Sequence, residues 1–133
     1  MFAWASIPSW YNEDMPAFAV TTAAQHYEAI VERGVLQRLG DYIPQKAGRI
    51  FVVTTEDVWA LHHASVECAL RGRTWHRIVF PGGEARKRLS SVEAMAEQMM
   101  EAGADRSSLV VAFGGGIVTD LGGFLAAIFM RGI

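Results

Sequence analysis

The most informative segment of this 133-residue sequence reads Leu109-Val-Val-Ala-Phe-Gly-Gly-Gly-Ile-Val-Thr-Asp120. Its apolar, partly β-branched start predicts a buried parallel strand over 109–113, and an apolar helix is predicted after the three glycines. Glycines at such a turn let a ligand approach the backbone, and the helix N-terminus offers N–H groups and a partial positive charge to an anion. The segment therefore favours a phosphate-containing ligand, although a tight strand-to-helix connection also accounts for the glycines.

The same strand-then-helix pattern occurs twice upstream. Strands are predicted over 49–54 and 77–80, with helices following to about Leu70 and over about 90–102. The segments Thr54-Thr-Glu-Asp57 and Ser90-Ser-Val-Glu93 resemble capping boxes at the helix starts, and Gly103 stands where a left-handed C-cap belongs. Strands that alternate with helices predict an α/β fold, a Rossmann-like parallel sheet with flanking helices.

The N-terminal part is less regular. Residues 1–24 show no clear period and predict an irregular arm or an edge strand, so the α/β domain is predicted to span residues 25–133. The segment 23–39 fits a helical period, but its part Tyr27-Glu-Ala-Ile-Val31 fits a strand equally well.

Composition excludes several classes of function. The chain has 12 Lys+Arg and 14 Asp+Glu, and this near-neutral balance does not suit a general nucleic-acid binder. The one cysteine, Cys68, forms no internal disulfide, which favours a reducing, cytoplasmic compartment. The apolar run 121–130 is half of the roughly 20 residues that a bilayer requires, so no membrane span is predicted.

Candidate ligand contacts also lie outside the glycine turn. Asp120, in the first turn of the last helix, either interacts with the helix dipole or accepts a hydrogen bond from a ribose or substrate hydroxyl. The segment Pro81-Gly-Gly-Glu-Ala-Arg-Lys87 follows the second strand, and an open parallel sheet places it at the same carboxyl edge as the glycine turn. There Glu84 can accept hydrogen bonds from ribose hydroxyls and Lys87 can pair with a phosphate, with a solvated basic loop as the alternative.

The histidines do not predict a metal site. His62 and His63 are adjacent and so point in different directions on a helix, and neither they nor His76 have a Cys or an acid that completes a ligand set.

The segment 114–133 closely resembles the central motif of the 3-dehydroquinate synthase family, which runs Gly-Gly-Gly, two aliphatics, Gly-Asp-Leu, Gly-Phe, small residues, an aromatic and Arg-Gly-Ile. Residues 81–87 look like the family's Gly-Glu-x-x-Lys segment. Tyr27-Glu-Ala-Ile-Val31 and Gly34-x-Leu36 look like its opening strand and turn, which favours strand over helix there. The resemblance covers about residues 27–133.

The resemblance implies the N-terminal, NAD-binding part of a lyase of the shikimate pathway, which supplies chorismate and the aromatic amino acids. Family members convert 3-deoxy-arabino-heptulosonate 7-phosphate into 3-dehydroquinate and phosphate, with bound NAD and a divalent metal, usually zinc or cobalt. NAD, this sugar phosphate and, in the full-length family, a second subunit of a homodimer are the implied partners. Arg131 matches a family arginine associated with the substrate phosphate. The implied cofactor contacts are Gly82, Gly83, Glu84, Lys87, Gly114, Gly115, Gly116, Ile117, Val118, Thr119 and Asp120.

The sequence departs from the family pattern at three positions. Thr119 replaces the usual glycine, and Thr55 and Asp57 stand where the family usually carries Asp and Asn. No catalytic or metal-ligating residue is assigned to this chain, because the substrate lysines, the Glu/His/His metal site and the C-terminal helical domain of the family are expected beyond Ile133. The chain alone is therefore expected to be inactive.

Two other interpretations stay open. The chain can be part of another sugar-phosphate cyclase of the same superfamily, such as one that makes valiolone- or inosose-type rings. It can also be a non-catalytic remnant that binds a nucleotide or a partner chain through its last helix. In that helix a stripe of apolar residues is expected to need a partner surface, namely Ile117, Leu121, Phe124 and Ile128.

Overall fold

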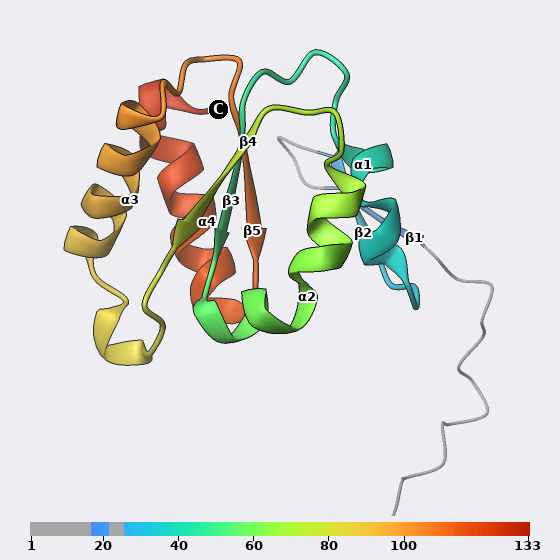
Figure 1. Ribbon diagram of the computed structural model, residues 1–133, viewed down its shortest axis with the longest axis horizontal. Coiled ribbons are helices and arrows are strands. Elements are labelled where there is room, and N and C mark those ends of the chain that lie inside the picture. The colour runs from blue at the N-terminus through green and yellow to red at the C-terminus, as the bar shows by residue number, and fades with distance from the viewer. Residues whose placement is uncertain (1–16, 22–25) are drawn as a thin grey trace, which may run out of the picture. The chain divides into compact units, whose positions relative to one another are not determined.

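The computed structural model describes residues 17–21 and 26–133 (Figure 1). Internal contacts separate two compact units, residues 1–35 and residues 36–133, and each is described by itself.

The N-terminal unit contains a pair of antiparallel strands. Strand β1 (Ala17–Thr21) pairs with strand β2 (His26–Ile30), with Val20 opposite Tyr27. The strand interpretation of residues 27–31 is thus confirmed apart from its last residue, and the helical alternative is wrong. The arm predicted over residues 1–24 otherwise lies outside the described residues.

The larger unit contains a three-stranded parallel sheet in the order β4-β3-β5. Strand β3 (Ile50–Thr54) lies in the middle, between β4 (Trp75–Val79) and β5 (Leu109–Phe113). The helices α2 (Glu56–Ala69), α3 (Leu89–Glu101) and α4 (Gly116–Ile128) each follow one strand. These elements confirm the predicted α/β fold. The shorter helical segments are η1 (Val35–Arg38), whose first residue is the last of the N-terminal unit, and, within the larger unit, α1 (Leu39–Tyr42), η2 (Glu84–Arg86) and η3 (Phe129–Arg131).

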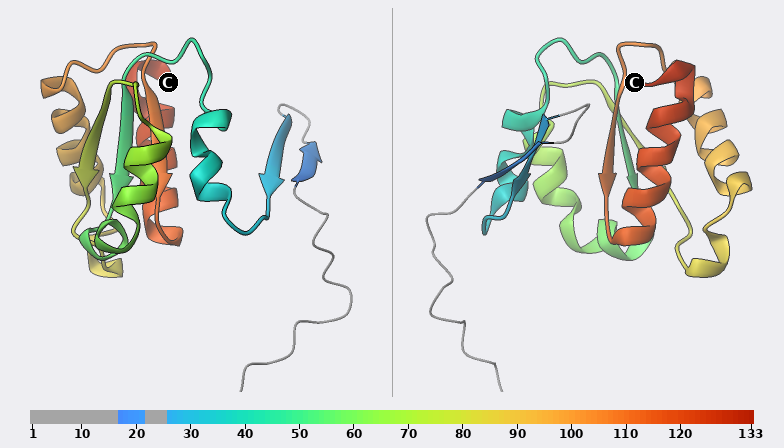
Figure 2. Two further views of the ribbon diagram at one scale, coloured as in Figure 1. Left: turned by 45° about the vertical axis from the view of Figure 1, so that its right-hand side comes forward. Right: turned by 180° about the vertical axis from the view of Figure 1, so that it is seen from behind.

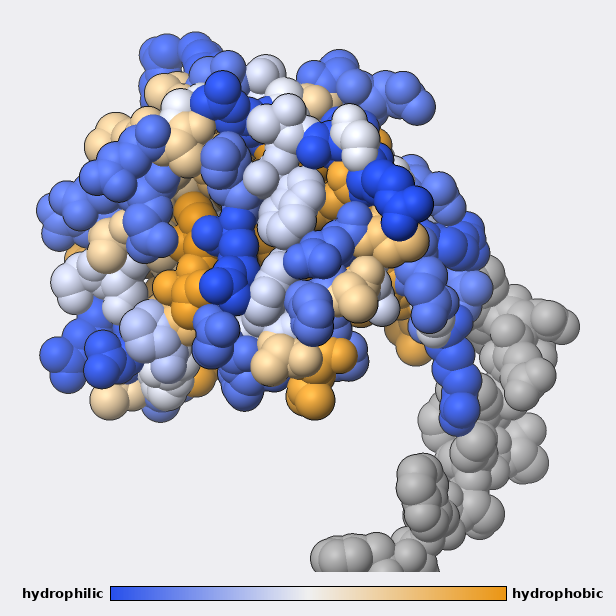
Figure 3. Space-filling model, in the orientation of Figure 1, coloured by the Kyte–Doolittle hydropathy of each residue, from blue (hydrophilic) through white to orange (hydrophobic). Residues whose placement is uncertain are grey.

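Two apolar layers sandwich the central strand, because its side chains alternate between the faces of the sheet. Phe51 and Val53 pack into the layer formed with α3 and α4, whereas Ile50 and Val52 pack into the layer formed with α1 and α2. Figure 2 shows the helices α3 and α4 together on one side of the sheet and α2 on the other. All five residues of β3 are buried, which explains its continuous apolar sequence. Figure 3 shows hydrophilic side chains over much of the face toward the viewer, with hydrophobic residues reaching the surface in a narrow strip.

The predicted capping boxes do not form. Helix α2 begins at Glu56. The first predicted capping box requires Thr54 as the cap, but Thr54 is buried at the end of β3. Its hydroxyl donates to the backbone oxygen of Thr55 at 3.4 Å. Helix α3 begins at Leu89, one residue before the predicted cap, so Ser90 already lies inside the helix. Neither N-cap residue makes a side-chain cap hydrogen bond.

The predicted C-cap of α3 is confirmed. Gly103 has a φ of 74°, which is the left-handed conformation that glycine adopts without steric cost. The N–H groups of Gly103 and Ala104 donate to the carbonyls of Met100 and Met99, both at 2.9 Å. This is the hydrogen-bond pattern of a Schellman motif.

The buried face of α4 differs from the predicted stripe. Val118, Leu121, Gly122 and Leu125 are the buried residues of this helix. Leu121 is thus the one predicted stripe residue that is buried, while Phe124 and Ile128 are 45% and 52% exposed. These two side chains line an open apolar cavity of about 380 Å³ with Leu89 and Val92 of α3. The difference arises because the sheet, which lies under Val118 and Gly122, determines the buried face.

Candidate functional site

Three loops meet at the carboxyl edge of the parallel sheet. Thr54, the last residue of β3, pairs in register with Val79 of β4 and Phe113 of β5, so the three strands end at the same level. The loops that follow enclose a cavity of about 200 Å³. Its lining residues are Thr55, Asp57, Val58, Phe80, Gly82, Gly83, Gly115, Gly116, Ile117 and Val118. The sheet thus brings the two predicted glycine segments together, at the edge where open α/β sheets bind ligands.

The glycines of the turn 114–116 divide into two roles. A Cβ atom on Gly114 would lie 2.9 Å from Cγ2 of Val118, so this glycine allows the strand-to-helix turn to be tight. A Cβ atom on Gly115 or Gly116 would meet no described atom within 4 Å, and both residues border the cavity. The tight connection thus applies to Gly114, whereas the ligand contact of Gly115 and Gly116, beside which there is open space, stays a prediction.

The α4 N-terminus faces the same edge. The backbone N–H groups of Val118 and Thr119 donate to the Gly115 carbonyl at 2.9 and 3.1 Å. The N–H groups of the residues before Val118 lie at the very start of the helix, where backbone N–H groups have no acceptor within the helix. They and the helix dipole favour an anion at this position.

The loop after β4 supplies the opposite wall. Gly82 and Gly83 have φ angles of 79° and 83°, which side chains rarely adopt, and their backbone lines the cavity. A Cβ atom on Gly82 would come within 3.5 Å of the Thr55 methyl group, so Thr55 packs closely under this loop. Glu84 begins the next segment, η2, and does not line the cavity.

An ion pair joins the two predicted segments. Nζ of Lys87 lies 2.7 Å from Oδ2 of Asp120, and both side chains are partly exposed to solvent. The hydrogen bond to Asp120 and its negative charge raise the pKa of Lys87 above its usual value. The pair joins the loop after β4 to α4. Asp120 is the fifth residue of this helix and not part of its first turn, which contains no acidic residue, so that part of the prediction is wrong. Neither Lys87 nor Asp120 is among the residues that line the cavity.

The threonine at the usual glycine position does not line the cavity. The hydroxyl of Thr119 donates to the Gly116 carbonyl within the helix at 3.0 Å, and the side chain is exposed. Its β-branched side chain is thus accommodated on the helix surface.

Four cavity residues were not among the predicted contacts, namely Thr55, Asp57, Val58 and Phe80. Asp57 lies in the first turn of α2, and Thr55 precedes that helix. Hydrogen bonds from the Thr55 side chain and from the Val58 backbone N–H hold the pKa of Asp57 below its usual value. The sequence signal for Thr55 and Asp57 was their departure from the family pattern directly after the first predicted strand.

Arg131 lies apart from this cluster. It ends η3, which follows α4, and the helical stretch from Asp120 to Ile128 alone is about 12 Å long at 1.5 Å per residue. Arg131 and the preceding Met130 both have positive φ angles, 72° and 47°. The structure does not bring Arg131 together with the predicted nucleotide contacts, and its role toward a substrate phosphate stays a prediction.

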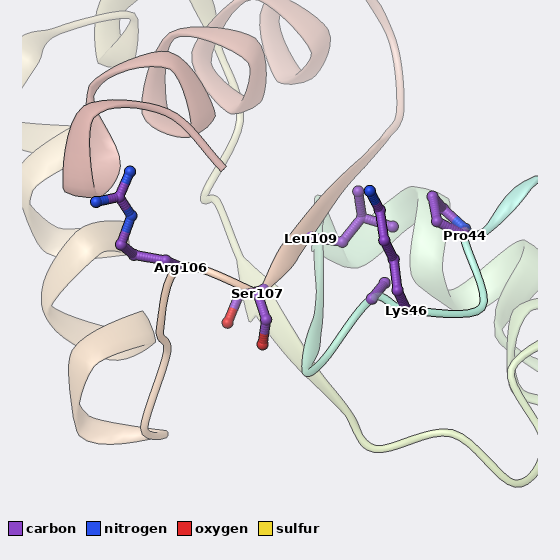
Figure 4. A pocket seen from close by; sticks show the side chains of 7 residues that line it. Pro44, Lys46, Arg106, Ser107 and Leu109 are labelled. Carbon is purple, nitrogen blue, oxygen red and sulfur yellow. The ribbon is translucent and has the colours of Figure 1, made fainter.

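A larger cavity, of about 380 Å³, lies at the amino edge of the sheet (Figure 4). It contains none of the predicted contacts. Figure 4 shows Lys46 and Arg106 on its rim, with the Arg106 side chain extending away from Lys46. The hydroxyl of Ser107, another lining residue, donates to Asp105 at 2.6 Å within the local turn. The candidate ligand site is therefore the cavity at the carboxyl edge.

Within residues 17–21 and 26–133, no group of three or more His, Cys, Asp or Glu residues could hold a metal ion. In the same described ranges no helix is long and apolar enough to cross a membrane.

Residues 77–133 match the family model of the 3-dehydroquinate synthase N-terminal region. The chain is 56% identical over 119 residues to a 3-dehydroquinate synthase of Solibacter usitatus and 37% identical over 121 residues to that of Halalkalibacterium halodurans. These alignments cover 90% of this chain but 33% and 34% of the two relatives. The chain thus spans about a third of the length of the curated relatives that it matches, and the resemblance stated from its motifs is confirmed over their N-terminal portion.

Solved structures of related cyclases share the fold. A 2-deoxy-scyllo-inosose synthase matches with a TM-score of 0.79 and 27% identity over 88% of this chain and 34% of that protein. A second structure of such an enzyme, complexed with carbaglucose-6-phosphate, NAD+ and Co2+, has the same TM-score and 25% identity. The 2-epi-5-epi-valiolone synthase ValA from Streptomyces hygroscopicus, with NAD+ and Zn2+ bound, matches with a TM-score of 0.60 and 26% identity.

Proposed function

We propose that this chain is the nucleotide-binding part of a 3-dehydroquinate synthase and that it binds NAD in the cavity at the carboxyl edge of its sheet. The observation that carries the proposal is the meeting of two glycine segments, around Gly82 and Gly115, at the N-terminus of α4. The similarity to curated 3-dehydroquinate synthases and the NAD+ in related cyclase structures support it.

The residues of the cavity suit a dinucleotide. The backbone of Gly115 and Gly116 leaves open space beside the helix N-terminus, where a pyrophosphate would accept hydrogen bonds from the N–H groups. Lys87 would add a positive charge to the same anion, and Asp120 would hold Lys87 in place through their 2.7 Å contact. When bound, NAD supplies reversible hydride transfer to the reaction.

The complete reaction would convert 3-deoxy-arabino-heptulosonate 7-phosphate into 3-dehydroquinate and phosphate, in the cytoplasmic shikimate pathway. It would need a divalent metal, and the described part of this chain contains no cluster that could hold one. The metal site and the substrate lysines would therefore come from outside the described residues, a second subunit would complete the enzyme, and the chain by itself would bind NAD without turnover. Arg131 would act there on the substrate phosphate.

A second cyclase activity is the alternative proposal. The solved structures that match are a 2-deoxy-scyllo-inosose synthase and a 2-epi-5-epi-valiolone synthase, which share this fold at 25–27% identity. The higher identity to curated 3-dehydroquinate synthases, 56% in one case, favours the first proposal.

Isothermal calorimetry with NAD and the 133-residue chain tests the function. Gly115→Val would place a branched side chain in the open cavity, so this variant should fold normally and lose NAD binding. Gly123→Ala, which adds a methyl group on an exposed part of the same helix, is the control and should bind like the wild type. If Gly115→Val binds NAD as tightly as the wild type, the NAD site is not this cavity. Absence of NAD binding by the wild type would leave the non-catalytic remnant as the better interpretation.

A further inference from the structure

A polar cavity lies at the amino edge of the parallel sheet, the edge opposite the glycine turn. Ile50 pairs in register with Trp75 and Leu109, so the three strands also begin at one level. Figure 1 shows the loops that lead into these strands together at this edge. They border an open cavity of about 450 Å³, a volume in the range of small-molecule sites. We call it the arginine cavity; it adjoins the cavity of Figure 4 at Ala47, and its lining side chains beyond that residue are Arg49, Arg73, Thr74 and Asp105.

Backbone carbonyl groups fix both arginine side chains of this cavity. Nη1 of Arg49 donates to the carbonyls of Ala102 and Gly103, just beyond the end of α3. Nη2 of Arg73 donates to two carbonyls of the loop 44–47, both at 3.1 Å. These bonds use one terminal nitrogen of each guanidinium group, which has five N–H donors in all. A ligand would therefore meet two cations that the backbone already holds in place.

Glycine backbone makes room for this arrangement. Gly72 and Gly103, which also line the cavity, have φ angles of 80° and 74°. A Cβ atom on Gly103 would collide with Nη1 of Arg49, whereas one on Gly72 would meet no described atom within 4 Å. Gly103 thus lets Arg49 reach the end of α3, and Gly72 leaves the cavity wall open.

The charge around the arginine cavity is positive. The two acids nearby are Glu101, the last residue of α3, and Asp105, whose carboxylate accepts hydrogen bonds from the N–H and hydroxyl of Ser107 at 2.8 and 2.6 Å. The C-termini of α2 and α3 add about half a negative charge each at this edge. Besides Arg49 and Arg73, three exposed cations lie next to lining residues in the sequence, and the ion pairs among the described residues include none of the three. They are Lys46, Arg71 and Arg106.

Two guanidinium groups in one cavity suit a phosphate group. The planar fork of an arginine donates to two oxygens of one phosphate, and a phosphate ester carries a charge of about −1.5 to −2 at pH 7. The hydroxyl of Thr74 adds a donor on the same wall. A metal cation would instead meet an excess of positive charge.

We propose that the arginine cavity is a second anion site, which binds a phosphate group through Arg49 and Arg73. The phosphate is either the inorganic ion or the ester of a small molecule. This site lies at the other edge of the sheet from the proposed NAD cavity, and the inference does not depend on NAD binding.

NMR titration of the 133-residue chain with inorganic phosphate tests the assignment. The Nε–H signals of Arg49 and Arg73 should shift together and saturate with one dissociation constant, on the order of 1 mM. Sodium chloride at equal ionic strength is the blank and should produce no saturating shift. The backbone amides of Gly115 and Gly116 report separately on phosphate at the carboxyl edge, so the two sites are distinguished.

Charge-removing variants test the role of the lining. Arg73→Gln should weaken the phosphate binding that is measured at Arg49 by at least about tenfold. Arg71→Gln is the matched control, because it removes the same charge two residues away and outside the lining, and it should change the binding by less than about threefold. Arg73→Lys keeps the charge without the planar fork, so its affinity should lie between those of the wild type and Arg73→Gln. Circular dichroism verifies that each variant is folded.

A second titration, with glucose 6-phosphate, distinguishes the two sources of the phosphate group. Tighter binding of the ester, with added shifts at the amides of Gly72 and Gly103, would support a phosphorylated small molecule as the ligand. Tighter binding of inorganic phosphate would support the free ion.

Three results would overturn the proposal. The first is the absence of a saturating shift at Arg49 and Arg73 in about 10 mM phosphate. The second is an equal shift in sodium chloride, and the third is an equal loss of affinity in Arg71→Gln and Arg73→Gln, because both would indicate a general effect of surface charge. If Arg73→Gln fails to fold, the wild-type titration and Arg73→Lys decide.

Discussion

Adjacent glycines in α4 should differ in how the same substitution changes the stability of the protein. Gly122 faces the sheet, and a Cβ atom built on it lies 2.7 Å from Cβ of Ala112 in β5. Gly123 is exposed, and a Cβ atom built on it meets no described atom within 4 Å. We therefore compare Gly122→Ala with Gly123→Ala.

The magnitude follows from two opposing terms. Replacing glycine by alanine inside a helix stabilises it by about 1 kcal/mol, and this gain is common to both variants. At position 122 the new methyl group needs roughly 3.5–4 Å from Ala112, so the helix and strand must separate by about 1 Å. Overpacking of this kind costs roughly 1–3 kcal/mol, which is also the expected difference in unfolding free energy between the two variants. For a unit of this size it corresponds to roughly 5–15 °C in Tm.

Urea and thermal denaturation followed by circular dichroism measure this difference. Gly123→Ala should unfold above the wild type and Gly122→Ala below Gly123→Ala. A double variant, Gly122→Ala with Ala112→Gly, removes the colliding methyl group and should recover part of the loss, as a double-mutant cycle would show. Equal stability of the two single variants would refute the close packing of α4 on β5, and with it the position of the helix N-terminus at the cavity.

Three further predictions concern turns and charges. Gly103→Ala should lower the unfolding free energy by about 1–2 kcal/mol in urea denaturation, because the residue has a φ of 74°; an unchanged midpoint would contradict the observed C-cap. The pKa of Lys87 is raised above 10.5 by Asp120, so the pair stabilises the fold below about pH 10.5 and this contribution is lost as the pH rises further. NMR titration should show the Lys87 pKa falling in Asp120→Asn, and no change would mean that the pair is not formed in solution. The pKa of Asp105 lies below 3.8 because of its hydrogen bonds with Ser107, so its contribution is present above that pH and lost as the pH falls through the lowered value. Ser107→Ala should raise the Asp105 pKa in a carbon-detected titration, whereas a constant value would exclude this cause.

The sequence by itself determined the class of fold, the three strands of the larger unit and the two glycine segments of the site. These features are local, because a β-branched run of about five residues favours a strand, and a glycine such as Gly83 or Gly103 marks a backbone conformation that other residues rarely adopt. The motif at 114–133 also pointed to a family whose members match this chain over their N-terminal portion.

The helix starts and the buried face of α4 needed the tertiary structure. The Thr54 side chain was expected to cap α2, but the central position of β3 in the sheet buries it. Phe124 and Ile128 have the spacing of core residues. They are nevertheless exposed, because the sheet lies under the other face of the helix, at Val118 and Gly122. Helical spacing identifies a set of neighbours on a helix, but which set is buried depends on where the other elements lie.

The site, too, became specific through the fold. Asp57 and Gly115 are far apart in the sequence and share one cavity because Thr54 pairs with Phe113 across two parallel strands. Arg131 is close to the glycine turn in the sequence but lies at the far end of α4, because a helix separates its ends by about 1.5 Å per residue. Residue types and local spacing are properties of the chain, whereas the distances between functional groups depend on strand order and helix direction, which only long-range packing determines.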